Sequence, residues 1–116
     1  MKKISLTLIM LFLFAGLARA EVGLASFYTI KSSGRITASG ERFQENAFTC
    51  ASMDYPFGTW LKITNIENHK FVFVKVNDRG NFKKKYRRII DLSKGAFDKI
   101  SDLKLGVITV KVEVVK

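Results

Sequence analysis

Cysteine and histidine are nearly absent from this chain of 116 residues, since each occurs once, as Cys50 and His69. A single cysteine cannot form an internal disulfide, which excludes the small secreted folds that are built around disulfides. One cysteine and one histidine cannot make a zinc site of the usual kind, and we expect neither a metal nor another cofactor. Cys50 is therefore interpreted as a small buried apolar side chain.

The first 20 residues differ in character from the rest of the chain. Two lysines precede a mostly apolar run from Ile4 to Leu17, and a small-x-small cleavage site ends at Ala20. This pattern is typical of a secretory signal peptide. The run is shorter than the roughly 20 residues that span a membrane, so we expect cleavage rather than a stable membrane anchor. We assign residues 1–20 to a signal peptide and 21–116 to one domain, located in the periplasm or secreted.

Acidic residues are few, with 10 aspartates and glutamates against 20 lysines and arginines, and the net charge is +10. Without the signal peptide, 17 of the basic residues remain against the 10 acidic ones, which leaves a charge of +7. An exported protein of this charge is expected to meet an anionic polymer or surface. Cell wall and membrane headgroups fit this expectation, whereas export makes nucleic acid the weakest candidate.

Most of the domain has the pattern of short strands separated by turns. Apolar and polar residues alternate over 60–66, and 71–76 returns after a turn at 67–70. Other segments rich in β-branched, aromatic or small apolar residues predict strands at 23–30, 47–52 and 107–115.

One helix is expected after Ser93, which can cap its first turn. Four apolar residues that follow fall on one face at helical spacing, namely Ala96, Phe97, Ile100 and Leu103. Many short strands with one helix predict a mainly β domain that forms a small closed barrel, because closure removes exposed strand edges.

Polar residues follow the strand 71–76 directly in the sequence "NDRG". A strand that ends in Asn77, Asp78 and Arg79 presents polar side chains at the rim of a rigid platform, and Gly80 permits a sharp change of direction. The alternative is an ordinary tight turn in which Asp78 accepts bonds from nearby backbone N–H groups.

Two other acids and one basic run are further candidates. Glu41 lies in the polar loop "TASGERF" and could equally be a solvated surface acid. Asp91 precedes the expected helix, where the helix dipole favours an acid. The run "KKKYRR" over 83–88 is either a solvated loop or a site that holds a polyanion by charge and stacks a sugar ring on Tyr86.

Six motifs occur in a fixed order over nearly the whole domain: "GLASFY", "GRITASGERF", "AFTCAS", "PFGTWLKITNIEN", "VKVNDRGNF" and "RIIDLSKGAF". This ordered set resembles the rare lipoprotein A family. The resemblance implies a six-stranded double-psi β-barrel with one or two short helices. It also implies a lytic transglycosylase that acts on peptidoglycan glycan strands, and we expect it to be a monomer.

The resemblance also implies the site residues. Glu41 matches the acid of the family's "ASGE" motif, and Asp78 matches the acid of "NDRG". Asp91 matches a region where an acid matters in the similar barrels of expansins and of a membrane-bound transglycosylase family. These three acids are our catalytic candidates, and the candidates for substrate binding are Ser52, Arg79, Tyr86 and Asn77.

The expected chemistry suits a small set of carboxyl groups. In a lytic transglycosylase the 6-hydroxyl of the sugar closes onto its own anomeric carbon, so one carboxyl can serve first as acid and then as base. We assign this role to Asp78, with Glu41 near enough to tune it or to hold the sugar. Adjacent side chains of a strand point to opposite faces, so Arg79 is expected to hold structure or substrate.

One position departs from the family pattern. The chain has Ser52 in "TCAS" where the family usually has a histidine in "TAAH". This departure favours the alternative function, a non-catalytic peptidoglycan-binding module similar to expansins.

Overall fold

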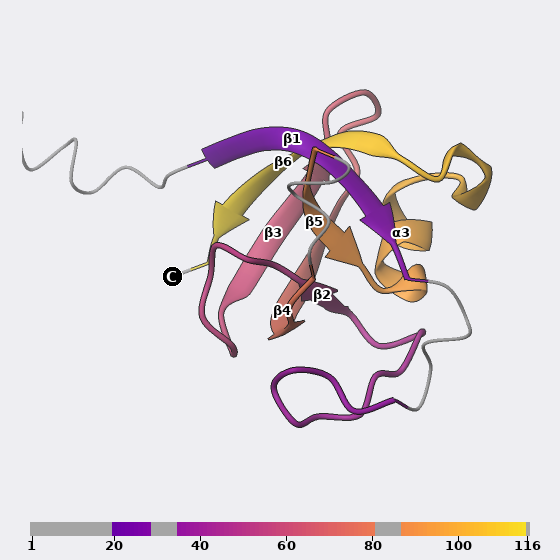
Figure 1. Ribbon diagram of the computed structural model, residues 1–116. Coiled ribbons are helices and arrows are strands. Elements are labelled where there is room, and N and C mark those ends of the chain that lie inside the picture. Colours follow the sequence, from indigo (N-terminus) through magenta and orange to yellow (C-terminus); the bar gives the residue numbers. More distant parts are fainter. Residues whose placement is uncertain (1–19, 29–34, 81–86, 116) are drawn as a thin grey trace, which may run out of the picture.

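The computed structural model of the protein describes residues 20–28, 35–80 and 87–115 (Figure 1). Apart from Ala20, the expected signal peptide lies outside these residues, and so does Tyr86. Within the described ranges, no helix combines the length and apolar character that crossing a membrane requires.

Six strands close into one barrel, which confirms the predicted mainly β fold. The order around the barrel is β1-β5-β2-β4-β3-β6, and β6 pairs with β1 to complete the ring. The strands are β1 (Ala20–Phe27), β2 (Thr49–Ala51), β3 (Trp60–Asn65), β4 (Phe71–Asp78), β5 (Arg88–Leu92) and β6 (Ile108–Val114).

Two of the strand pairs are parallel, β1 with β5 and β2 with β4, and the other pairs are antiparallel. Each parallel pair contains a shift of register, between Leu24 and Ala25 in β1 and between Cys50 and Ala51 in β2. Such irregularities change the direction in which the following side chains point. The long connection that leads into β2 extends beyond the body of the barrel (purple in Figure 1).

The strands differ from their predicted bounds in two informative places. β4 continues through Asn77 and Asp78, so Asp78 is the last residue of a strand. The segment 88–92, for which no strand is predicted from the sequence, forms β5 between β1 and β2. Asp91 does precede the helix, two residues before its cap Ser93, but it lies within β5 and the first turn of the helix itself contains no acid.

The core lies inside the barrel and is built by the inward members of each alternating strand. Leu61, Ile63, Val74 and Val76 are fully buried, as their alternation predicts. Cys50 is also fully buried among them, which confirms its interpretation as an apolar core residue.

Helix α3 (Lys94–Ile100) closes one end of the core. The Ser93 hydroxyl accepts a hydrogen bond from the Ala96 N–H at 3.2 Å, which confirms the predicted cap. Ala96, Phe97 and Ile100 are buried, and the Phe97 ring contacts the Phe27 ring with 4.8 Å between centroids. The helix ends before Leu103, which instead begins the 3-10 turn η2 (Leu103–Leu105) and packs against the core.

Gly95 is expected to tolerate no larger residue. A Cβ added to it would lie 2.9 Å from the Cα and the carbonyl oxygen of Asn46, and these backbone atoms cannot rotate away. We expect Gly95→Ala to lower the free energy of unfolding by about 1–3 kcal/mol, as overpacking usually does. Urea unfolding would measure this loss against Lys94→Ala, a change in the same helical turn, and equal stability of the two variants would contradict it.

Candidate active site

A loop over residues 35–43 lies against the end of β4. Ile36 and Arg42 form an isolated bridge that closes the loop on itself. The Ser39 N–H donates to the carbonyl of Asn77 at 3.2 Å. The Ala38 N–H donates to Asp78 Oδ1 at 2.9 Å. This loop, 40 residues away in sequence, is thereby fixed over the last two residues of the strand.

Asp78 is bound by three donors from three parts of the chain. Its Oδ1 accepts the backbone N–H of Ala38 and the backbone N–H of Arg79, the latter at 2.8 Å. Its Oδ2 accepts the Tyr28 hydroxyl at 3.0 Å. The local bonding of an ordinary turn is therefore present, but the contacts with Ala38 and Tyr28 also fix the carboxyl relative to distant segments. Among the described residues, a side chain is the sole hydrogen-bond partner of Oδ2.

Tyr28 follows β1 and lies between the strands and the loop. Its ring packs edge-on against Phe43, with 4.6 Å between centroids. Burial raises the pKa of the Tyr28 hydroxyl, and the nearby charges of Asp78 and Asp91 raise it further. The hydroxyl therefore keeps its proton, and a neutral hydroxyl can either donate to Asp78 or accept from it.

Asp78 and Asp91 lie on either side of Ala51 in the barrel wall. Ala51 is the register partner of Asp78 in β4 and of Asp91 in β5. The two acids are thus separated by one intervening strand, so their backbones lie roughly 9–10 Å apart. Ser26 of β1 continues the row, as it is paired with Asp91 and donates its hydroxyl to Asp91 Oδ1 at 2.7 Å.

The carboxyl of Asp91 is half-buried, and its surroundings favour the protonated form. Burial raises the pKa of Asp91, and the charge of Asp78 adds to this effect. The hydrogen bond from Ser26 and the charge of Arg88 act in the opposite direction, but the net pKa is raised. Like charges held near each other in this way resist joint ionisation.

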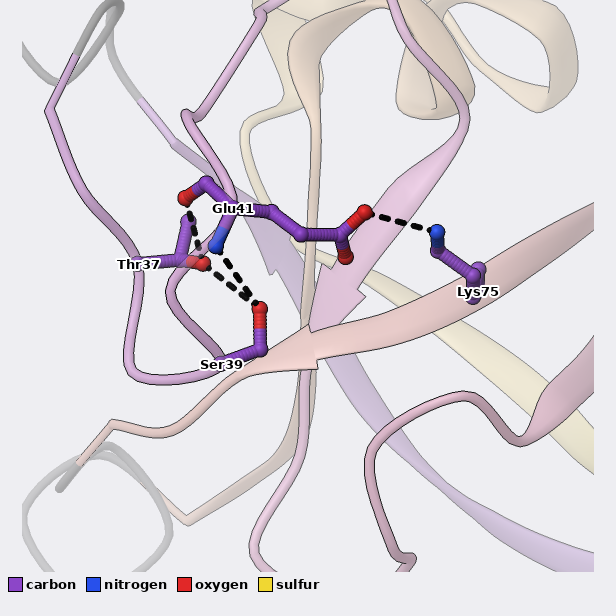
Figure 2. A network of polar contacts seen from close by, with 4 residues as sticks. All are labelled: Thr37, Ser39, Glu41 and Lys75. Carbon is purple, nitrogen blue, oxygen red and sulfur yellow. Dashed lines mark hydrogen bonds and ion pairs between the residues drawn. The ribbon is translucent and has the colours of Figure 1, made fainter.

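The Glu41 side chain extends toward Lys75 of β4 (Figure 2). Its Oε2 forms an ion pair with Lys75 Nζ at 2.8 Å, and both side chains are substantially exposed. The hydrogen bond from Lys75 lowers the pKa of Glu41. The Glu41 backbone is held by the loop itself, because its carbonyl accepts the Thr37 hydroxyl at 2.8 Å and its N–H donates to the Ser39 hydroxyl at 3.3 Å.

The other predicted site residues mostly support the backbone around Asp78. The Arg79 guanidinium donates to the Ser52 carbonyl at 2.8 Å and stacks over the Phe57 ring at 4.0 Å. Ser52 is only 1% exposed, and its hydroxyl accepts the Asp54 N–H. Asn77 is also buried, beneath the loop. Their roles as substrate contacts stay predictions.

A small hollow of about 160 Å³ opens beside Asp78. Glu41 is not among the described residues that line it, which are Tyr28, Arg35, Ile36, Thr37, Phe43 and Asp78. The structure thus brings Asp78 together with Tyr28 and Asp91, whereas it pairs Glu41 with Lys75. This arrangement can exchange a proton at Asp78 Oδ2 with a group that enters the hollow.

Sequence reasoning missed Tyr28, Ser26 and Lys75 as members of the site. The first two lie at the end of the predicted strand 23–30, where Ser26 and Tyr28 share one parity. Because alternate residues of a strand point to one face, this spacing could have predicted that the two side chains lie on the same face of the strand.

Asp91→Asn should change how stability depends on pH. The raised pKa means that the folded state binds more protons than the unfolded chain between the ordinary and the raised pKa of Asp91. Protonation of Asp91 therefore stabilises the folded wild type at low pH, and this stabilisation is lost as pH rises through that window. We expect Asp91→Asn to be more stable than the wild type at neutral pH, with the difference shrinking toward acid pH.

Urea unfolding from below the ordinary aspartate pKa to neutral pH would measure this effect. Asp98→Asn, a change at an exposed position of α3, is the matched control and should follow the wild type. A constant difference between Asp91→Asn and the wild type at every pH would contradict the prediction.

Comparisons with known proteins bear on the family and the fold. A family model described as a lytic transglycolase matches residues 20–112. The chain is 44% identical over 102 residues to a probable endolytic peptidoglycan transglycosylase RlpA of Synechocystis sp., covering 88% of this chain and 31% of that protein. It is also 44% identical over 93 residues to the endolytic peptidoglycan transglycosylase RlpA of Campylobacter jejuni, covering 80% of this chain and 33% of that protein. The chain thus spans about a third of the length of these relatives.

Solved structures share the fold at low sequence identity. A mutant Clavibacter michiganensis expansin in complex with cellohexaose superposes with a TM-score of 0.66 at 20% identity, covering 84% of this chain and 51% of the expansin chain. A Streptomyces papain inhibitor also has a TM-score of 0.66, at 22% identity, and covers 84% of this chain and 96% of its own. These likenesses concern the barrel alone.

Proposed function

The chain belongs to the lytic transglycolase family, whose model it matches over most of its length, and from this membership we propose that it cleaves peptidoglycan glycan strands as a lytic transglycosylase. The observation that carries the proposal is the placement of Asp78 at the hollow, where Tyr28 is the one described residue whose side chain bonds to its Oδ2. The names of the relatives, which describe endolytic peptidoglycan transglycosylases, support the choice of substrate.

The proposed reaction needs one carboxyl group that moves a proton twice. Protonated Asp78 donates from Oδ2 to the glycosidic oxygen as the bond between that oxygen and the anomeric carbon breaks. The 6-hydroxyl of the same sugar then attacks the anomeric carbon and forms the anhydro ring. Its proton passes to Asp78, which restores the acid, and no water is consumed.

Tyr28 is proposed to serve both protonation states of Asp78. Its hydroxyl donates to the ionised carboxylate and can accept from the protonated one, so Oδ2 has a partner throughout the cycle. Asp91 lies across Ala51 from Asp78, and its pKa is raised by burial and, in smaller part, by the charge of Asp78. Pairs of acids with different environments divide their roles in this way in many hydrolytic sites.

Glu41 is proposed to hold the sugar rather than to move the proton. Its pKa is lowered by Lys75, so it is poorly suited to begin the reaction as an acid. Arg79, Asn77 and Ser52 are proposed to act on substrate mainly by fixing the end of β4, since Arg79 joins Ser52 to the strand.

Several properties of the whole protein complete the proposal. Residues 1–20 would direct export and be removed, and the domain from residue 21 would act as a monomer in the periplasm or outside the cell, without a stable membrane anchor. Action on peptidoglycan supports a location outside the cytoplasm, and the charge of the domain supports an anionic polymer as partner.

The alternative is a peptidoglycan-binding module without catalysis. The specific observation in its favour is Ser52, whose hydroxyl is buried and bonded to the Asp54 N–H, so it offers no titrating group to the hollow. Purified protein incubated with peptide-free sacculi distinguishes the two functions. Anhydro-sugar ends found by mass spectrometry support the enzyme, whereas sedimentation with sacculi and no released fragment at any pH supports the module.

A further inference from the structure

Three large aromatic side chains lie exposed on the outer surface of β3 and β4, and a fourth precedes β2. Trp60, Phe71 and Phe73 are the outward members of the alternating strands and are 47%, 52% and 45% exposed. Phe48, which precedes β2, is 39% exposed and lines surface hollows with each of them. We call these four residues the aromatic face. Contiguous apolar groups on a protein surface mark an interaction site more often than scattered ones do.

Two shallow hollows flank Phe48 on this face. One, of about 310 Å³, lies between Phe48, Trp60 and Lys75. The other, of about 270 Å³, lies between Phe48, Phe71 and Phe73. The first is at the lower end of the range for small-ligand sites, roughly 300–1,000 Å³, and the second is slightly below it. Neither is lined by Asp78, so the aromatic face is distinct from the hollow beside that acid.

Three lysines surround the aromatic rings. Lys62 Nζ lies 4.5 Å from the centroid of Phe71, and Lys99 Nζ lies 6.0 Å from that of Phe48. Lys75 is the register partner of Trp60 and lines the hollow beside it. Rings therefore alternate with ammonium groups, which excludes a purely apolar occupant and favours one that carries negative charge.

A carboxylate-bearing polysaccharide has both of the properties that suit this face, flat apolar surfaces for the rings and negative charge for the lysines. The C–H faces of sugar rings are flat and apolar and stack on aromatic side chains, and carboxylates pair with lysines. In a peptidoglycan strand without peptides, every second sugar carries a lactyl carboxylate. Lys75 already binds a carboxylate, that of Glu41, at 2.8 Å.

The same ion pair joins the aromatic face to the loop over residues 35–43. Lys75 contacts the hollow beside Trp60, and its partner Glu41 belongs to the loop that covers Asp78. One extended polymer could therefore contact both surfaces. An exposed ion pair of this kind contributes little to stability, so a carboxylate from the polymer can replace Glu41 at low cost.

We propose that the aromatic face binds a carboxylate-bearing glycan strand, and that the domain thereby holds its polymer at a surface separate from the Asp78 hollow. Sugar rings stack on Trp60 and on the phenyl rings, and the lysines pair with the lactyl carboxylates. The inference rests on the proposed function for the identity of the polymer.

The test measures binding in an Asp78→Asn background, so that cleavage cannot obscure it. The probe is peptide-free glycan from sacculi, compared with the same glycan after its carboxylates have been converted to neutral amides. We expect the double variant Trp60→Ala, Phe73→Ala to bind the charged glycan about tenfold or more weakly, as loss of central aromatic anchors usually does. Neutralised glycan and high ionic strength should weaken binding of the parent protein.

Leu105→Ala is the matched control, because Leu105 is 62% exposed, lies in η2 and lines neither of the two hollows. Unchanged binding by the double variant, equal binding to charged and neutralised glycan, or binding only to vesicles of anionic lipid would each overturn the inference. Binding by the Asp78→Asn protein, together with no anhydro products from the wild-type protein, would refute the proposed enzyme and leave this inference standing. Cleavage by the wild-type protein, together with no loss of binding in the double variant, would do the reverse.

Discussion

Asp78→Asn is expected to release anhydro-sugar fragments from peptide-free sacculi about 10²- to 10⁴-fold more slowly than the wild type, which is the usual contribution of a general acid or base. The amide has nearly the shape of the carboxyl group and can still accept the N–H groups of Ala38 and Arg79 through its oxygen. It cannot give a proton to the glycosidic oxygen, and therefore the chemical step should fail while the fold remains.

The measurement is the initial rate of product formation, with unfolding followed in parallel. Asp98→Asn removes an equivalent carboxyl from an exposed position and should retain the wild-type rate. An active Asp78→Asn protein would remove Asp78 from the acid role. If Asp91→Asn were inactive in the same assay while Asp78→Asn remained active, the proton-transfer role would belong to Asp91.

Phe97→Ala is expected to lower the free energy of unfolding by about 3–5 kcal/mol, the usual loss when a buried phenylalanine is truncated. The side chain of Phe97 is fully buried, and its ring contacts Phe27 at the end of β1. A domain of this size is stabilised by only about 5–15 kcal/mol, so the change would remove a large part of the total.

Urea unfolding would measure this loss, and Phe73→Ala provides the comparison within the same residue type. Phe73 is 45% exposed, so we expect its truncation to cost about 1 kcal/mol or less. Equal losses in the two variants would show that α3 does not seal the core as described.

The strands and the helix could be predicted where local periodicity is strong. Alternation identified β3, β4 and β6, and the spacing of Ala96, Phe97 and Ile100 identified α3. β5 was missed because its five residues combine a short apolar pair with Asp91 and lead directly into the helix. A segment of that length carries too little pattern to separate a strand from the start of a helix.

The site was less predictable because it depends on the order of strands around the barrel. Asp78 and Asp91 become neighbours only because β2 lies between β4 and β5 and presents Ala51 to both. Tyr28 reaches Asp78 across 50 residues of sequence. The motifs identified Asp78 and Glu41 separately. No local pattern could show that Tyr28 bonds to Asp78 or that Lys75 pairs with Glu41.

The burial of Cys50 has a practical consequence for work on this protein. The thiol is fully enclosed, and burial, followed by the charge of Asp91, raises its pKa, so little reactive thiolate forms in the folded barrel. Oxidants and alkylating reagents should therefore reach this sulfur only when the strands separate. The rate of alkylation at this one cysteine reports how often the barrel opens, without any engineered label.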